Sequence, residues 1–107
     1  MKILFSRDEG ELTISLSGDL DHHSARVAIP EISGRIDTEL PVRLVLDFSD
    51  VRFMDSSGIA LAINAYKRSS LIGCTFRIIN VPAQAYKVFS AAGISGIIDI
   101  HTKEIKV

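Results

Sequence analysis

The stretch of the sequence that most limits the possible folds is residues 42–48, VRLVLDF. It is short, apolar and rich in β-branched side chains, which is typical of a strand covered on both faces. A second stretch of this kind, CTFRIIN, occupies residues 74–80. The segment between them carries apolar residues at helical spacing: Ile59, Ala62, Ile63 and Tyr66. This order predicts parallel strands joined by a right-handed crossover.

The N-terminal segment predicts an antiparallel hairpin. Apolar and polar residues alternate on both sides of Asp8-Glu9-Gly10, so that one face of each strand would be buried. The apolar positions are Ile3, Phe5, Leu12, Ile14 and Leu16. The next segment, His22 to Leu40, has a helical pattern that Pro30 and Gly34 interrupt. We therefore expect a kinked helix or two short helices there.

The C-terminal segment predicts one more helix and a last strand. Gly73 would end the preceding helix, Pro82 fits the first turn of the next one, and Gly93 lies past its end. A short strand is expected at Ile97, Ile98 and Ile100, and the polar tail HTKEIKV is expected to fray.

The alternation of strands and helices predicts an α/β fold in a single domain spanning residues 1–107. The sheet would be mixed and mostly parallel, with an N-terminal antiparallel hairpin, and the helices would pack mainly as one layer. Apolar residues make up 47% of the chain, which is enough for a hydrophobic core.

The composition also limits the cellular compartment and the classes of partner that are expected. A formal net charge of -1 and the lack of a basic stripe argue against direct nucleic-acid binding. No apolar run approaches the roughly 18 residues of a membrane span, so no membrane partner is expected. The single cysteine, Cys74, cannot form an internal disulfide and is expected to be structural. These features predict a cytoplasmic protein.

The stretch FMDSSGIA, residues 53–60, places an acid, two hydroxyls and a glycine between apolar neighbours. In the predicted fold it follows the carboxyl end of a parallel strand and begins a helix, where binding sites of α/β proteins gather. A helix start has unpaired N–H groups and a partial positive charge. A serine there could be a plain cap or could carry a phosphate.

A second polar stretch, GDLDHHSA at residues 18–25, also follows a strand and precedes a helix. Together, Gly18-Asp19-Leu20-Asp21 and Met54-Asp55-Ser56-Ser57-Gly58 resemble two motifs of the bacterial anti-sigma factor antagonists, which are stand-alone STAS domains. AAGISGIIDI, residues 91–100, resembles the end of that family's third helix and its last strand. The resemblance covers residues 3–100. The chain departs from the family at Pro30 and Gly34, where its members have an unbroken helix, and in a short tail after Asp99.

The resemblance implies a switch in a partner-switching system. In this family the unmodified antagonist binds an anti-sigma factor that is also a serine kinase of the GHKL type, and the sigma factor is released. The kinase then phosphorylates the serine before the motif glycine, here Ser57, with ATP, and the antagonist dissociates. A PP2C-type serine phosphatase restores the unmodified form. The resemblance thus implies a regulatory protein with no enzymatic activity and no cofactor.

Each of the two acids beside Ser57 has two possible roles. Asp21 is either the cap of the following helix or a neighbour of Ser57 across the end of the sheet. Asp55 either caps the helix that begins near it or orients the kinase. Ser56 is expected to cap that helix through its hydroxyl, with modification of Ser56 as the lesser alternative.

Two apolar or small residues complete the candidate site. Gly58 would leave room for a partner's backbone or simply add flexibility, and Ile59 would belong partly to the core and partly to an exposed binding patch. No catalytic or metal-ligating residue is expected, because His22 and His23 lack a third ligand at a sensible spacing and suit a solvated loop.

Two other functions compete with the switch. A hydrolase would use Ser57 as its nucleophile, but the chain has neither a G-x-S-x-G elbow nor a G-x-x-x-x-G-K-[ST] phosphate loop. The alternative is a STAS subunit of a transport or sensory complex that binds a partner helix without being phosphorylated. Such a subunit needs a large apolar surface, whereas a switch needs a modest patch ringed by charges around Ser57.

Overall fold

The computed structural model describes residues 1–103. Within them, five strands form one sheet in the order β1-β2-β3-β4-β5. β1 (Lys2–Asp8) and β2 (Glu11–Leu20) form the expected antiparallel hairpin. Each later strand runs parallel to the strand before it: β3 (Arg43–Met54), β4 (Thr75–Val81) and β5 (Asp99–Thr102). The spatial order of the strands is therefore their order in the chain.

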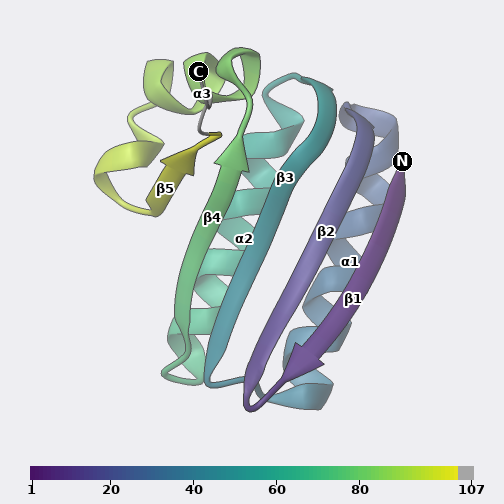
Figure 1. Cartoon of the computed structure of the whole chain (residues 1–107), viewed down its shortest axis with the longest axis vertical. Helices are drawn as coiled ribbons and strands as arrows, with labels where there is room; N and C mark the ends of the chain where they lie inside the picture. Colours follow the sequence, from purple (N-terminus) through teal and green to yellow (C-terminus); the bar gives the residue numbers. More distant parts are fainter. Residues whose placement is uncertain (104–107) are drawn as a thin grey trace.

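The helices lie mainly in one layer. α1 (His22–Glu39) and α2 (Ser57–Leu71) pack side by side on one face of the sheet, and α3 (Ala83–Ala91) lies beyond the end of β4 (Figure 1). Phe89 of α3 reaches the same core, where its ring centre lies 5.8 Å from that of Phe48 on β3. The predicted mixed α/β architecture is confirmed.

β3 is longer than predicted, and helices cover only one of its two faces. It runs to Met54, because its pairing with β2 continues to the register Leu20↔Met54. Leu44, Leu46 and Phe48 alternate onto the helix-covered face and are buried. The expectation that both faces are covered was wrong, since α1 and α2 share one face (Figure 1). On the open face Val45 is buried between its register neighbours on β2 and β4.

α1 is one continuous helix, so of the two forms expected, a kinked helix or two short helices, the second was wrong. Pro30 lies inside it and removes the N–H that would bond to the carbonyl of Arg26. Both residues are on the exposed side, where water can serve that carbonyl. The opposite side of the helix is held on the sheet by a buried stripe: Ala25, Ala28, Ile32, Ser33 and Ile36. Packing along this stripe outweighs the cost of the proline.

The remaining turns follow the sequence closely. Gly73 has the left-handed φ of 67° that was expected of a residue just after a helix. Cys74, which follows it, is buried, and this burial raises the pKa of its thiol, as suits a structural cysteine. Pro82 lies one residue earlier than predicted, as the N-cap of α3, because its ψ of 158° is extended.

The last strand begins at Asp99 rather than at Ile97. Ile94 and Ile98 are buried around a short 3-10 turn, Ile94–Gly96, while Ile97 is exposed. Of the tail that was expected to fray, residues 101 and 102 belong to β5, and residues 104–107 lie outside the described part of the chain.

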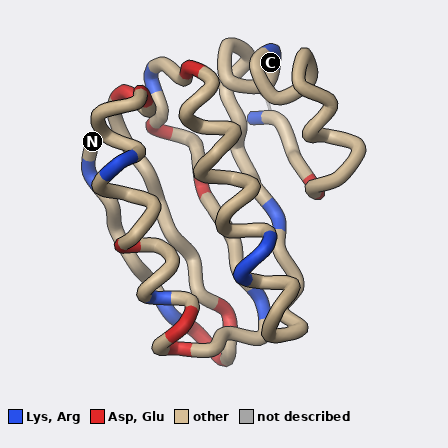
Figure 2. The backbone as a smooth tube through the Cα atoms, turned by 180° about the vertical axis from the view of Figure 1, so that it is seen from behind, with Lys and Arg blue, Asp and Glu red and all other residues tan. Residues whose placement is uncertain are grey.

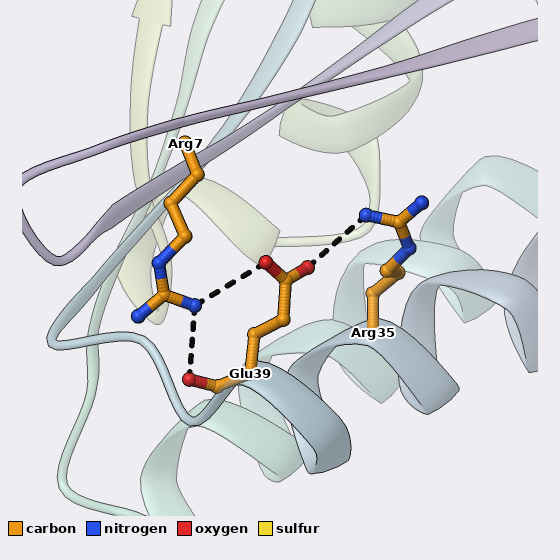
Figure 3. A network of polar contacts seen from close by, with 3 residues as sticks. All are labelled: Arg7, Arg35 and Glu39. Carbon is orange, nitrogen blue, oxygen red and sulfur yellow. Dashed lines mark hydrogen bonds and ion pairs between the residues drawn. The ribbon is translucent and has the colours of Figure 1, made fainter.

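A charged cluster ties the edge strand β1 to the end of α1 (Figure 3). Arg7 Nη1 donates to the backbone carbonyl of Glu39 at 3.0 Å and to its Oε1 at 3.3 Å. Arg35 Nη1 donates to Glu39 Oε2 at 3.2 Å, and its guanidinium lies 4.0 Å above the centre of the Phe5 ring. The hydrogen bond from Arg35, followed by the contacts with Arg7, lowers the pKa of Glu39 from its ordinary value of 4.5.

Glu39→Gln is expected to lower the thermal midpoint at neutral pH by a few degrees at most, because exposed ion pairs are weak. A lowered pKa in the folded state stabilises the protein above the ordinary pKa and loses that effect as the pH falls through the folded value. The difference between Glu39→Gln and wild type should therefore shrink below about pH 4.5. Thermal melts from pH 7 to 3 measure this. Glu31→Gln, an exposed change on the same helix, should show no such convergence.

Candidate functional site at the ends of β2 and β3

The two polar stretches picked out in the sequence lie side by side. β2 and β3 are parallel neighbours, and Leu20 and Met54 are in register at their ends. The N–H of Asp55 donates to the carbonyl of Leu20 at 3.2 Å. The loops that begin α1 and α2 therefore leave the sheet at the same edge, where acidic positions lie close to basic ones (Figure 2).

Asp21 is the N-cap of α1. Its Oδ1 accepts from the N–H of Ser24 at 2.9 Å, and the Ser24 Oγ accepts from the N–H of Asp21 at 3.0 Å, which completes a capping box. The Ser24 hydroxyl also donates to the carbonyl of Asp19 at 2.8 Å. The backbone hydrogen bond from Ser24, followed by its side-chain bond, lowers the pKa of Asp21. The cap reading of Asp21 is confirmed, on a loop that adjoins the one carrying Ser57.

Asp21→Ala is expected to lower the thermal midpoint by a few degrees while the protein still folds, because the capping box is lost. The lowered pKa means that this stabilisation is present above the ordinary pKa of 3.8 and disappears as the pH falls through the folded value. Thermal melts of wild type and variant should therefore converge below about pH 3.8. Equal midpoints at pH 7 would contradict the capping role.

Asp55, rather than Ser56, caps α2. Asp55 Oδ1 accepts from the N–H of Ser57 at 2.7 Å. Ser56 has helical backbone angles, φ −62° and ψ −15°, and its side chain makes no capping hydrogen bond. The prediction of a Ser56 cap was wrong, because the residue before it already reaches the first free N–H and Ser56 continues the helical turn. Its side chain is left exposed.

Ser57 is the first residue of α2 and is half-buried. Among residues 1–103, no partner accepts from or donates to its hydroxyl. The neighbouring N–H groups are less free than a helix start suggests: Gly58 donates to the carbonyl of Asp55 and Ile59 to that of Ser56, both at 3.1 Å. The Ser57 hydroxyl thus lies at the partly positive N-terminus of α2, which favours a negative group there, and few N–H donors around it are free.

Gly58 faces the core, which neither of its predicted roles anticipated. It is buried, and a Cβ at this position would overlap the Sδ and Cγ atoms of Met54 and lie 3.1 Å from Leu20 Cδ2. The missing side chain therefore lets α2 approach the ends of β2 and β3. Gly58 fixes the position of the loop from inside, and it leaves no space for a partner.

The amide of Gln84 is a part of the site that the sequence patterns did not indicate. Gln84 Oε1 accepts from the N–H of Met54 at 2.8 Å, and Gln84 Nε2 donates to the carbonyl of Met54 at 2.8 Å. α3 is thereby joined to the last residue of β3. A glutamine in the first turn of a helix has no periodic signature, so only the folded arrangement shows this contact.

Ile59 borders a hollow between α2 and α3 of about 500 Å³, lined mainly by apolar side chains. The other lining residues are Gln84, Lys87, Val88, Ala91 and Ala92. Ile59 is half-buried, as expected of a residue that is partly core and partly surface. An apolar hollow with a lysine on its border thus lies directly beside the turn that carries Ser57.

Two further classes of feature bear on function: metal ligands and membrane-spanning helices. His22 and His23 are exposed as expected, but they lie in the first turn of α1 and not in a loop. The described residues contain no group of three or more His, Cys, Asp or Glu able to hold a metal ion. Among these same residues, no helix has the length and apolar character needed to cross a membrane.

Known proteins resemble this chain over nearly its whole length. The anti-sigma F factor antagonist of Paenibacillus polymyxa is 26% identical over 105 residues, which cover 98% of this chain and 90% of that protein. The anti-sigma factor antagonist SpoIIAA in its unphosphorylated form has the same fold, with a TM-score of 0.80, 23% identity, and coverage of 95% of this chain and 90% of that one.

The Bacillus cell fate determinant SpoIIAA in the phosphorylated form also shares the fold, with a TM-score of 0.72, 23% identity, and coverage of 95% and 93% of the two chains. The model of the STAS domain family matches residues 2–106. This chain therefore belongs to the STAS domain family.

Proposed function

We propose that the protein is an anti-sigma factor antagonist whose binding to an anti-sigma factor serine kinase is controlled by phosphorylation of Ser57. The observation that carries the proposal is the Ser57 hydroxyl itself. It lies at the start of α2 without a hydrogen-bond partner among residues 1–103, on a turn fixed by Asp55 and Gly58. The names of the relatives, which are antagonists of anti-sigma factors, support the same function.

In the proposed reaction this protein is the substrate of the kinase. The kinase, of the GHKL type, would transfer the terminal phosphoryl group of ATP to the Ser57 oxygen. A new P–O bond forms to serine, the bond to ADP breaks, and the hydroxyl proton passes to a base of the kinase. A PP2C-type phosphatase would hydrolyse the phosphoserine. On this proposal the protein is not an enzyme and acts in the cytoplasm.

The surface around Ser57 suits an interaction that must end when a charge is added. Ile59 and the neighbouring hollow are apolar, and Lys87 adds a positive charge to the lining of the hollow. Asp21 and Asp55 add negative charges on the two loops at the ends of β2 and β3. Small patches with polar borders are usual in transient complexes. A STAS subunit of a transport or sensory complex, the alternative function, would remain bound whatever the state of Ser57.

The proposal is tested with the purified protein, its candidate anti-sigma factor kinase and ATP. Wild type should gain the mass of one phosphate, and Ser57→Ala should gain none and remain bound to the kinase, because the hydroxyl is lost while the surface is nearly unchanged. Ser56→Ala, the matched control, should be phosphorylated as wild type is. Trypsin leaves both serines in the peptide of residues 53–67, so the two variants are what separates them.

Phosphate on Ser57→Ala but not on Ser56→Ala would move the site to Ser56. Wild-type protein that binds the kinase stably, takes up no phosphate and is not released with ATP would instead support the permanent-subunit function.

A further inference from the structure

Among residues 1–103, no strand lies on the outer side of the end of β3. β3 pairs with β4 only as far as Asp47↔Ile79, while it continues beside β2 to Leu20↔Met54. In a strand the N–H and C=O of one residue point to the same edge, and those of the next residue point to the opposite edge. Since the N–H of Asp55 bonds to β2, the polar groups of Met54 point to the side that β4 has left. Met54 is fully buried, so its backbone groups need a partner other than water.

The side-chain amide of Gln84 is that partner. It accepts from the Met54 N–H and donates to the Met54 carbonyl, each at 2.8 Å. A carboxamide offers the same donor and acceptor as a peptide group, so Gln84 replaces the missing strand for one residue. The helix that carries it is anchored next to the same strand, because Ala85 and Phe89 of α3 are buried and Phe89 packs against Phe48.

Met54 also connects directly to the turn that holds Ser57. Its side chain fills the space against Gly58, and its carbonyl carbon is bonded to Asp55, whose carboxylate holds the N–H of Ser57. A shift of the Met54 backbone therefore moves the whole turn. Gln84 itself makes no hydrogen bond to Ser57.

We propose that Gln84 is a positioning residue for Ser57, which it holds in the orientation that a kinase phosphorylates. This inference rests on the proposed function. Holding a nucleophile in one orientation raises the rate of the bound complex, since less motion must be frozen at the reaction step. Loss of the Gln84 contact should therefore lower kcat for phosphorylation more than it raises KM.

The experiment compares Gln84→Met, which has a side chain of similar length without the hydrogen bonds, with Gln84→Glu, which keeps an acceptor and loses the donor. Ser90→Ala, an exposed change on the same helix, is the control. The first measurement is amide hydrogen exchange in the free protein. In Gln84→Met the Met54 amide should exchange at least about tenfold faster, and the Ile14 amide in β2 should be unchanged.

The second measurement is the steady-state rate of Ser57 phosphorylation. We expect kcat to fall at least about fivefold in Gln84→Met, with a smaller change in KM because Gln84 also lines the hollow beside Ile59. Ser90→Ala should behave as wild type. Should Gln84→Met fail to fold, the kcat of Gln84→Glu decides instead.

Met54 exchange at the wild-type rate in a folded Gln84→Met would overturn the inference, as would an unchanged kcat. A wild-type protein that takes up no phosphate would contradict the proposed function instead. In that case the exchange measurement alone decides whether Gln84 holds the turn.

Discussion

Gly58→Ala is expected to lower the free energy of unfolding by about 1 to 3 kcal/mol, the usual cost of overpacking a filled core. The added methyl group would overlap the side chain of Met54, which is fully buried, and would lie 3.1 Å from Cδ2 of the equally buried Leu20. Alanine is the better helix former by about 1 kcal/mol, so the substitution has one favourable contribution. The overlap should outweigh it, because Met54 must move within a packed core.

Gly34→Ala is the matched control. Gly34 lies in α1, and a Cβ there would meet nothing within 4 Å. The same substitution should therefore raise the free energy of unfolding by about 0.5 to 1 kcal/mol. Urea denaturation of both variants measures the two changes. If Gly58→Ala stabilised the protein as Gly34→Ala does, the close approach of α2 to Met54 would be wrong.

The strands and helices could be predicted because their buried residues recur at a regular spacing in the sequence. Alternating residues such as Leu12, Ile14 and Leu16 identified the hairpin strand β2, and Gly73 marked the end of α2. These signals are local, since each depends on a few neighbouring residues. The order of strands and helices then limited the topology to parallel neighbours.

Features that depend on distant contacts could not be read in this way. Pro30 is a local signal against a helix, yet α1 continues through it because the stripe from Ala25 to Ile36 packs on the sheet. β3 extends beyond its apolar run because β2 continues to pair with it. In both cases tertiary packing overrides a local preference.

The candidate site shows the same division. The prediction that each polar stretch follows a strand and precedes a helix is confirmed, but the sequence could not decide which side chain caps α2. Asp55 and Ser56 are both good cap residues, and the choice depends on backbone angles at the turn. The roles of Gly58 and Gln84 depend on the exact place of Met54, which no pattern in the sequence specifies.

Phosphorylation of Ser57 is expected to release the kinase without refolding the protein. At a helix N-terminus a negative charge is worth about 0.3 to 1 kcal/mol in its favour. A phosphoserine brings roughly −1.5 to −2 charges near neutral pH. Asp55, whose Oδ1 lies 2.7 Å from the Ser57 nitrogen, opposes this gain, and few N–H groups of the turn are free to bind the phosphate. The net effect on folding should be close to zero.

The effect on binding should be much larger. In the complex the phosphate would face a protein surface instead of water, and burying a charge without a full set of partners costs several kcal/mol. Each 1.4 kcal/mol corresponds to about tenfold in affinity. The affinity of the phosphorylated protein, or of Ser57→Asp, for the kinase should thus fall at least about tenfold. Ser70→Asp, which adds the same charge as Ser57→Asp at the exposed far end of α2, should bind nearly as wild type does.

Two measurements separate a local mechanism from a conformational switch. The thermal midpoint should stay within a few degrees of wild type, and backbone amide shifts should change only near residues 53–62 and in the part of α3 that Gln84 joins to Met54. Chemical-shift changes spread through β1, β2 and α1 would contradict the local mechanism. The turn is hydrogen-bonded to those elements through the carbonyl of Leu20, the last residue of β2. The phosphate would then act by rearranging the sheet, and the loss of affinity would no longer measure the cost of covering its charge.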